Sequence, residues 1–377
     1  MWKVQLFKLN FDNRERDAVA DVVAGGWLTM GERIVSFENA FAEYLGSGAR
    51  CVAVANGTAA LHMALLALDV GVNDEVIIPA LTFVADANSV RMVGAKPILA
   101  DCASLADWNV SAESIARRIS PNTKAVIVVH YAGFPCDMPA ISALCQERGI
   151  KLIEDVAHAP GALAAGQSCG TWGDISCYSF FSNKNLSIGE GGMVVTKDEK
   201  LFQRLCYLRS HGMTTLTLDR HKGRAITYDV AEPGLNYRMD EMRAAIGLVQ
   251  LGKLPAGNAR RAELTARYRN NFQGSLVQMP FAELRKEDIS AFHILPVLLP
   301  VDVNRVAVID GLKAKGIQSS IHYPPFWSFS GYAGYFDPKD TPVAAEICGR
   351  ELTLPLYPTM TDEEVDLVTS SLLECLQ

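Results

Sequence analysis

The chain has 377 residues, of which 49% are apolar and 20% charged, and it contains 29 glycines and 17 prolines. This composition is typical of a folded protein of two or three domains and excludes collagen-like, coiled-coil and disordered chains. The formal charge is −7, and no basic run occurs. Binding to nucleic acid or to an anionic membrane through bulk charge is therefore not expected.

The nine cysteines are scattered and include no Cys-x-x-Cys pair. This pattern favours buried thiols in a reducing compartment over disulfides or a zinc site. The first residues lack the apolar core of a signal peptide, and no stretch of 18 apolar residues occurs. We therefore expect a cytoplasmic protein, an enzyme by its size, with no metal and no membrane span.

Two helices are predicted within the first fifty residues. Asp12 and Asn13 are suited to begin the first, which Gly25 and Gly26 would end. The second covers about residues 34–44, where aromatic residues recur at helical spacing and precede Gly46.

The pattern then alternates between short β-branched runs and helical stretches. Strands are predicted at 51–55, 75–78, 96–100, 125–129, 151–154 and 193–196, with helices at 59–68, 112–119 and 138–148 between them. Such alternation predicts an α/β fold whose central, mostly parallel sheet has helices on both faces. Chemistry in such folds gathers at the carboxyl ends of the strands.

The pattern changes after about residue 240. The sequence predicts a long helical stretch that Gly and Pro interrupt near 252–257 and that leads into helical residues 263–272. A strand at 317–322 and a last helix at about 362–376 follow. We expect a large α/β domain over residues 1–250 and a smaller α/β domain over 251–377.

Two chemically informative motifs follow predicted strands. Residues 56–60, Asn-Gly-Thr-Ala-Ala, come directly after the strand at 51–55 and open a helix, an arrangement that lets helix amides approach a phosphate. Many such turns bind no ligand. The strand at 151–154 delivers Glu154 and Asp155, whose side chains point to opposite sides, so one of them faces a given ligand. The alternative is a carboxylate that only caps the next helix.

The third motif runs from residue 176 to residue 192 and contains Lys184 among apolar and small residues, followed by four residues Gly-Glu-Gly-Gly. Burial would lower the pKa of this amine and make it nucleophilic, as Schiff-base chemistry requires. The alternative is a lysine that reaches solvent from a loop. The fourth motif, residues 234–239, is a loop before a helix of small residues.

Together these motifs favour one cofactor. A phosphate cradle, a carboxylate at a strand end and a lysine 29 residues later are the attachments that pyridoxal phosphate (PLP) needs. Lys184 would bind the aldehyde, and Asp155 would keep the pyridine nitrogen protonated so that the ring withdraws electrons. The cradle and Ser179 would bind the phosphate.

The stretches 56–65, 79–83, 154–161, 179–192, 234–251 and 354–365 resemble, in order, the signatures of the DegT/DnrJ/EryC1/StrS family of PLP-dependent aminotransferases. The resemblance covers nearly the whole chain. It implies fold type I of the PLP-dependent transferases and a homodimer that shares its active sites.

The resemblance also implies roles for matching residues. Lys184 would carry the cofactor and move the proton between donor and cofactor, and Asp155 would pair with the pyridine nitrogen. Phe83 would stack on the ring. His158 stands where many members have Gln near the phenolic oxygen, and it could make the same hydrogen bond only as the suitable tautomer.

Further residues are implied in binding. Asn236 would reach the phosphate from the neighbouring subunit, and His322 and Tyr323 belong to a loop near the sugar-binding mouth. The implied phosphate contacts are Gly57, Thr58, Ala59 and Ser179.

Two departures from the family pattern stand out. Phe181-Ser182-Asn183 replaces a turn that contains Pro in many relatives, which leaves Lys184 in register but puts an extra phosphate contact there in doubt. A longer segment at about 214–232 contains a cationic cluster that includes Arg220 and Arg224. These arginines would bind a substrate diphosphate or a donor carboxylate, unless the cluster is simply a solvated loop.

By this resemblance, the protein moves an amino group from L-glutamate to a keto-sugar, most often linked to a nucleotide, in amino-sugar biosynthesis for a surface polysaccharide or a secondary metabolite. A cyclitol aminotransferase would share the same core motifs. Sugar dehydratases of the family have His at the lysine position, so Lys184 disfavours that activity. A catalytically idle PLP-binding regulator is the alternative from another class, and the intact Lys184, Asp155 and Asn236 speak against it.

Overall fold

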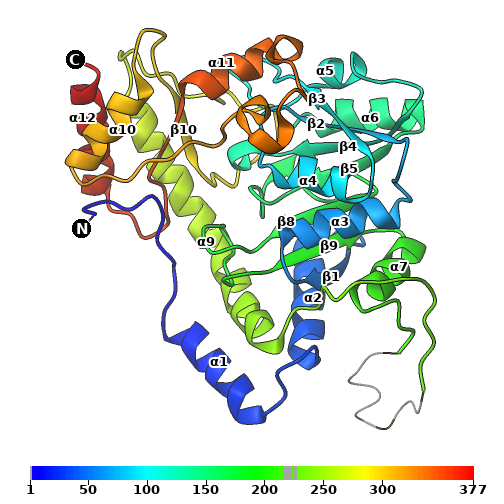
Figure 1. Ribbon diagram of the computed structural model, residues 1–377. Helices are drawn as coiled ribbons and strands as arrows, with labels where there is room; N and C mark the ends of the chain where they lie inside the picture. Colours follow the sequence, from blue (N-terminus) through cyan, green and yellow to red (C-terminus); the bar gives the residue numbers. More distant parts are fainter. Residues whose placement is uncertain (1, 216–222, 224–226) are drawn as a thin grey trace.

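A seven-stranded sheet forms the centre of the computed structural model, which describes residues 2–215, 223 and 227–377 (Figure 1). The strand order is β1-β9-β8-β5-β4-β2-β3. In it, β9 runs antiparallel to both neighbours, and the other paired strands are parallel. The strands are β1 (Arg50–Val54), β2 (Glu75–Pro79), β3 (Lys96–Ala100), β4 (Thr123–Val129), β5 (Lys151–Asp155), β8 (Ile175–Ser179) and β9 (Gly192–Thr196).

This sheet confirms the predicted fold class and all six predicted strands. The strand β8 was not predicted, because its five residues, Ile-Ser-Cys-Tyr-Ser, show neither a long apolar run nor a clear alternation. It nonetheless pairs with β5 and β9 in the middle of the sheet.

Helices cover both faces of the sheet (Figure 1). Alternate residues of β1 enter the two cores: Val52 and Val54 pack in one, and Cys51 and Ala53 in the other. The first core also contains residues of α3 (Gly57–Ala67), α4 (Ala85–Met92) and α7 (Glu199–Arg209). The second contains residues of α2 (Glu32–Leu45), α5 (Ala112–Ala116), α6 (Met138–Arg148) and α9 (Glu241–Asn271).

Helix ends follow the predicted signals near the N-terminus. Asp12 caps α1 (Asn13–Gly25) in a capping box with Glu15, and Gly26 ends that helix in the left-handed conformation. Gly46 follows the last residue of α2, as predicted.

The helix α9 is continuous over 31 residues and includes Pro255, so the interruption predicted near 252–257 is wrong. Proline removes one backbone donor. The buried side chains of Leu251, Leu254 and Leu264 hold the helix together on both sides of it. The boundary between residues 250 and 251 lies within this helix, and the division into two domains stays a prediction.

A third core lies in the C-terminal part of the chain, where the end of α9 packs with a small antiparallel pair of strands. The pair is β10 (Leu295–Leu298) and β11 (Glu351–Leu354), with α10 (Arg305–Ala314), α11 (Pro342–Arg350) and α12 (Asp362–Cys375) nearby. The prediction of a strand at 317–322 is wrong, because this segment forms only isolated bridges, at Ile317 and Ser320.

Short elements complete the described chain. They are β6 (Leu163–Ala164), β7 (Gln167–Ser168), and the 3₁₀ turns η1 (Tyr131–Gly133), η2 (Phe326–Ser328), η3 (Ser330–Tyr332) and η4 (Pro338–Asp340). Among the described residues, no helix has the length and apolar character needed to cross a membrane.

Candidate active site

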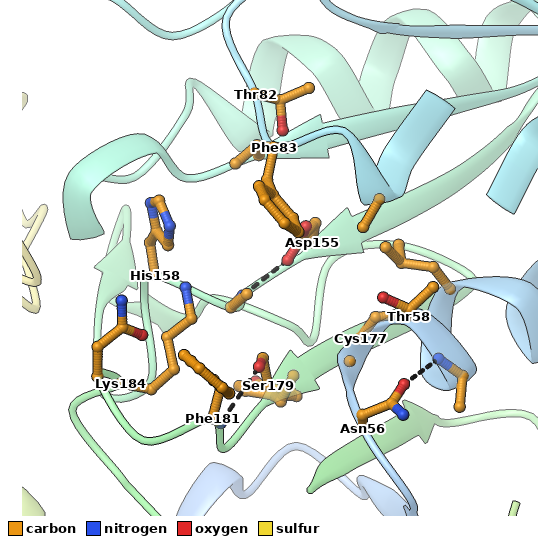
Figure 2. Close-up of a pocket in the computed structure, with 18 of the residues that line it drawn as sticks. Asn56, Thr58, Thr82, Phe83, Asp155, His158, Cys177, Ser179, Phe181 and Lys184 are labelled. Carbon is orange, nitrogen blue, oxygen red and sulfur yellow. Dashed lines mark hydrogen bonds between the residues drawn. The ribbon is translucent and has the colours of Figure 1, made fainter. Parts of the chain in front are cut away.

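A cavity of about 560 Å³ lies where β1, β5 and β8 end and α3 begins. This is the carboxyl edge of the parallel strands, where the sequence places chemistry. Ten predicted site residues line the cavity: Gly57, Thr58, Ala59, Phe83, Asp155, His158, Ser179, Lys184, His322 and Tyr323. Figure 2 shows Phe83, Asp155, His158 and Lys184 around the same space.

Three predicted residues do not join this group. Asn236 is exposed, forms a bridge with Ser210 and does not line the cavity of its own chain. Arg220 and Arg224 lie outside the described residues.

The N-terminus of α3 forms one wall of the cavity. Asn56 caps it, accepting the Ala59 amide at 2.8 Å (Figure 2), while in the described part of the chain no acceptor is hydrogen-bonded to the amides of Gly57 and Thr58. A Cβ on Gly57 would lie 2.8 Å from the Cβ of Ser179. Only glycine therefore lets these free amides and the Ser179 hydroxyl converge, as a phosphate group requires.

Lys184 lies in the loop after β8, and its side chain extends into the cavity (Figure 2). The loop is held by the Lys184 amide, which donates to the Phe181 carbonyl at 2.9 Å. Desolvation in the cavity lowers the pKa of Lys184 to about 8, although the Asp155 carboxylate opposes this shift. The amine is thereby partly unprotonated, and nucleophilic, near neutral pH.

Asp155 ends β5 and is 8% exposed. Its Oδ1 accepts the Ala157 amide at 2.8 Å. Burial raises the pKa of Asp155, while this hydrogen bond and the charge of Lys184 lower it. A buried carboxylate that lines a cavity suits a protonated ring nitrogen.

Glu154, the neighbour of Asp155, faces away from the cavity and is fully buried. It accepts the amides of Gly170, Trp172 and Gly173 at 2.7 to 2.8 Å. This confirms that the two carboxylates have opposite orientations, and it makes Glu154 the anchor of a loop.

His158 forms a pair with Tyr323. The Ala132 amide donates to Nδ1 of His158 at 3.2 Å, so the proton of the neutral ring is on Nε2, which lies 2.8 Å from the Tyr323 hydroxyl. Burial, with the nearby charge of Lys184, lowers the pKa of His158 well below its usual value. Because Nε2 carries the proton, it could donate a hydrogen bond to the phenolic oxygen of the cofactor. In this structure, however, it faces the hydroxyl group of Tyr323. The role of His158 toward the cofactor stays a prediction.

Tyr237 and Asn183 also line the cavity, although neither is among the predicted site residues. The Tyr237 hydroxyl lies 3.0 Å from Nδ1 of His62 on α3. The carboxamide oxygen of Asn183 is buried without a hydrogen-bond partner among the described residues. Asn183 directly precedes Lys184, and this position in the sequence could have identified it as a residue that lines the site.

The cavity residues fit PLP. They supply free helix amides and a hydroxyl for a phosphate, an amine of lowered pKa for an aldehyde, and a buried carboxylate for a pyridine nitrogen. Within the described residues, no cluster of side chains suits a metal ion.

Comparisons with known proteins agree with this arrangement. A family model described as the DegT/DnrJ/EryC1/StrS aminotransferase family matches residues 10–373. An uncharacterized protein from Methanocaldococcus jannaschii is 35% identical over 95% of this chain and 94% of its own length.

Two solved structures are similar along their whole length. The aminotransferase TlmJ from Streptoalloteichus hindustanus has a TM-score of 0.90 and 33% identity, covering 100% of this chain and 99% of its own. Spr1654 from Streptococcus pneumoniae, named as a sugar aminotransferase and solved in a PLP form, has a TM-score of 0.90 and 28% identity over 97% of each chain.

The fold and the site define an enzyme of the PLP-dependent aminotransferase class, with the type I fold. Within that class, the chain belongs to the DegT/DnrJ/EryC1/StrS aminotransferase family.

Proposed function

We propose that this aminotransferase moves an amino group from L-glutamate to a keto-sugar linked to a nucleotide, with PLP as cofactor. The main support for the proposal is that Lys184, Asp155 and the N-terminus of α3 line the same cavity. Similarity to TlmJ and to Spr1654, the latter named as a sugar aminotransferase, supports a sugar as the substrate class.

Each residue has a defined task in this proposal. The amides of Gly57 and Thr58, with Ser179, would hold the phosphate, and Lys184 would hold the aldehyde carbon. Asp155 would keep the ring nitrogen protonated, and the bound cofactor supplies an electron sink for the bond broken at the donor carbon. The Nζ of Lys184, with its pKa of about 8, would then move the proton as a general base and acid.

The proposal includes a homodimer in which Asn236 of one protomer reaches the site of its partner. Asn236 is exposed and lies outside the cavity of its own chain, which supports such a role. Large apolar side chains at the cavity mouth, Phe83 and Phe181, are 53% and 43% exposed and suit coverage by a second protomer.

To test the proposal, L-glutamate is first added to the PLP-loaded protein to convert the cofactor to its amine form. A panel of acceptors is then supplied to this protein. Keto-sugar nucleotides, the corresponding free keto-sugars and a keto-inositol are compared by the return of the aldehyde-form absorbance and by mass spectrometry of the product. We expect amination of a keto-sugar nucleotide. Turnover of the keto-inositol alone would instead assign a cyclitol aminotransferase, and a cofactor that L-glutamate does not convert would favour a regulator.

A further inference from the structure

Asp86 is a second carboxyl group behind the cavity, and neither the sequence motifs nor the proposed mechanism gives it a role. It lies in the first turn of α4 and is 0% exposed. Its carboxyl group is within hydrogen-bonding reach of the Asp155 carboxyl group. The residue that would face the ring nitrogen therefore has an acid as its buried neighbour.

The contacts of Asp86 leave one oxygen without a donor. Its Oδ2 accepts the Thr82 hydroxyl at 2.5 Å. Its Oδ1 is buried and has no hydrogen-bond donor among the described residues. A buried carboxylate oxygen without a donor is costly, whereas a protonated Oδ1 becomes a donor itself, and Asp155 is the acceptor within reach.

The other groups around the two carboxyls leave Asp86 without a cation. Lys184 and His130 act electrostatically on Asp155, and in the described part of the chain neither a lysine nor an arginine is paired with Asp86. Cys177 of β8 and Tyr323 also face the pair, and burial raises the pKa of both, so they are neutral.

Burial, together with the charge of Asp155, raises the pKa of Asp86 well above its usual value. Two features oppose this shift, namely the Thr82 hydroxyl and the N-terminus of α4. Both are dipoles, and they are weaker than a neighbouring carboxylate in a buried site.

We propose that Asp86 keeps its proton at neutral pH and donates it from Oδ1 to the carboxylate of Asp155. The pair then carries one proton and one negative charge, and the charge stays on Asp155. Asp86 is thus a positioning residue: it orients Asp155 and, by donating a hydrogen bond, keeps it ionised opposite a protonated ring nitrogen. The positioning role rests on the proposed function, because it requires a bound cofactor. The shared proton does not require a cofactor.

The shared proton is tested by infrared difference spectroscopy of cofactor-free protein at pH 7, comparing wild type with Asp86→Asn. Asparagine has nearly the same shape and offers a neutral donor. We expect a carboxylic-acid C=O band in the wild type that shifts in D₂O and is absent from Asp86→Asn. A wild-type-minus-Asp86→Asn difference spectrum without such a band would overturn the shared proton. Burial raises the pKa of Glu351 to about 7, and the band of this carboxyl group is common to both proteins and cancels in the difference.

The positioning role is tested by titrating cofactor-free variants with PLP. Asp86→Ala is expected to weaken PLP binding about 10- to 100-fold, because Asp155 loses its donor, and Asp86→Asn is expected to restore most of this loss. Ser89→Ala is the matched control, since it removes a buried hydrogen bond to the Asp86 carbonyl within the same helix and leaves both carboxyls in place.

Wild-type PLP affinity in a folded Asp86→Ala variant would contradict the positioning role, as would Asp86→Asn binding no better than Asp86→Ala. If Asp86→Ala does not fold, a loss in Asp86→Asn as large as that in Asp155→Asn contradicts the role equally. Failure of the wild type to bind PLP would count against the proposed function, and the infrared band would still decide the shared proton.

Discussion

Lys184 combines two properties at the scale of a single side chain. It extends into a cavity that desolvates its amine, and the negative charge of Asp155 opposes this effect. Because desolvation is the larger of the two, the pKa falls to about 8 from an ordinary value near 10.5. The amine can therefore attack an aldehyde at a pH where a surface lysine remains protonated.

This shift predicts how fast cofactor-free protein captures PLP as pH changes. The unprotonated amine is the reactive form, so the capture rate should rise with pH up to about 8 and then level off. The measurement is stopped-flow absorbance between pH 6 and pH 10, with Lys184→Ala as the control for capture by the other amines of the chain. A rate that keeps rising to pH 10 would show that the cavity does not lower this pKa.

Among the elements, the N-terminus of α3 can approach Ser179 closely because Gly57 has no side chain. A Cβ on Gly57 would lie 2.8 Å from the Cβ of Ser179, closer than packed atoms approach. Gly57→Ala should therefore push α3 away from β8 and weaken PLP binding about tenfold or more.

The measurement for Gly57→Ala is the dissociation constant of PLP, with thermal unfolding of the cofactor-free protein alongside. Gly25→Ala is the matched control, since no atom lies within 4 Å of a Cβ there. Equal PLP affinity in the Gly57 and Gly25 variants would mean that the approach of α3 to Ser179 does not form the cradle.

The elements also show which features the sequence could predict. The six predicted strands are short runs that contain β-branched residues, and the residues that follow them, including Asn56 and Asp155, were correctly expected at the carboxyl edge. The strand β8 and the continuity of α9 depend on packing against other parts of the chain, which local propensity does not record.

The cavity residues likewise include some that the sequence identifies and some that only the tertiary structure reveals. Lys184 and Asp155 belong to short motifs with chemical meaning, so the sequence identifies them. Asp86 lies on α4, a helix that the sequence did not predict, and its importance arises only because α4 brings it beside β5. Tyr323 comes from a segment more than 100 residues after the strands, and its contact with His158 is a tertiary one.

For the whole molecule we expect an assembly of two protomers. Lys184 lines the cavity, while Asn236 is exposed elsewhere on the same chain. In a symmetric dimer each active site would take Lys184 from one protomer and Asn236 from the other.

Mixing two inactive variants tests this arrangement. Lys184→Ala and Asn236→Ala dimers should each have little activity, and dimers re-formed from an equal mixture should recover about a quarter of the wild-type rate, since half of them contain one intact site. Re-formed Lys184→Ala dimers alone are the control. No recovery in a mixture shown to contain heterodimers would mean that both residues act within one chain.

The central claim is that Lys184 carries an amino transfer from L-glutamate. The most direct measurement is the absorbance of PLP-loaded protein on addition of L-glutamate, with 2-oxoglutarate quantified at the end, in wild type and in Lys184→Ala. In the wild type we predict conversion of the cofactor to its amine form with one equivalent of 2-oxoglutarate per site, and in Lys184→Ala no conversion and no 2-oxoglutarate. Wild-type-like conversion in Lys184→Ala would contradict it.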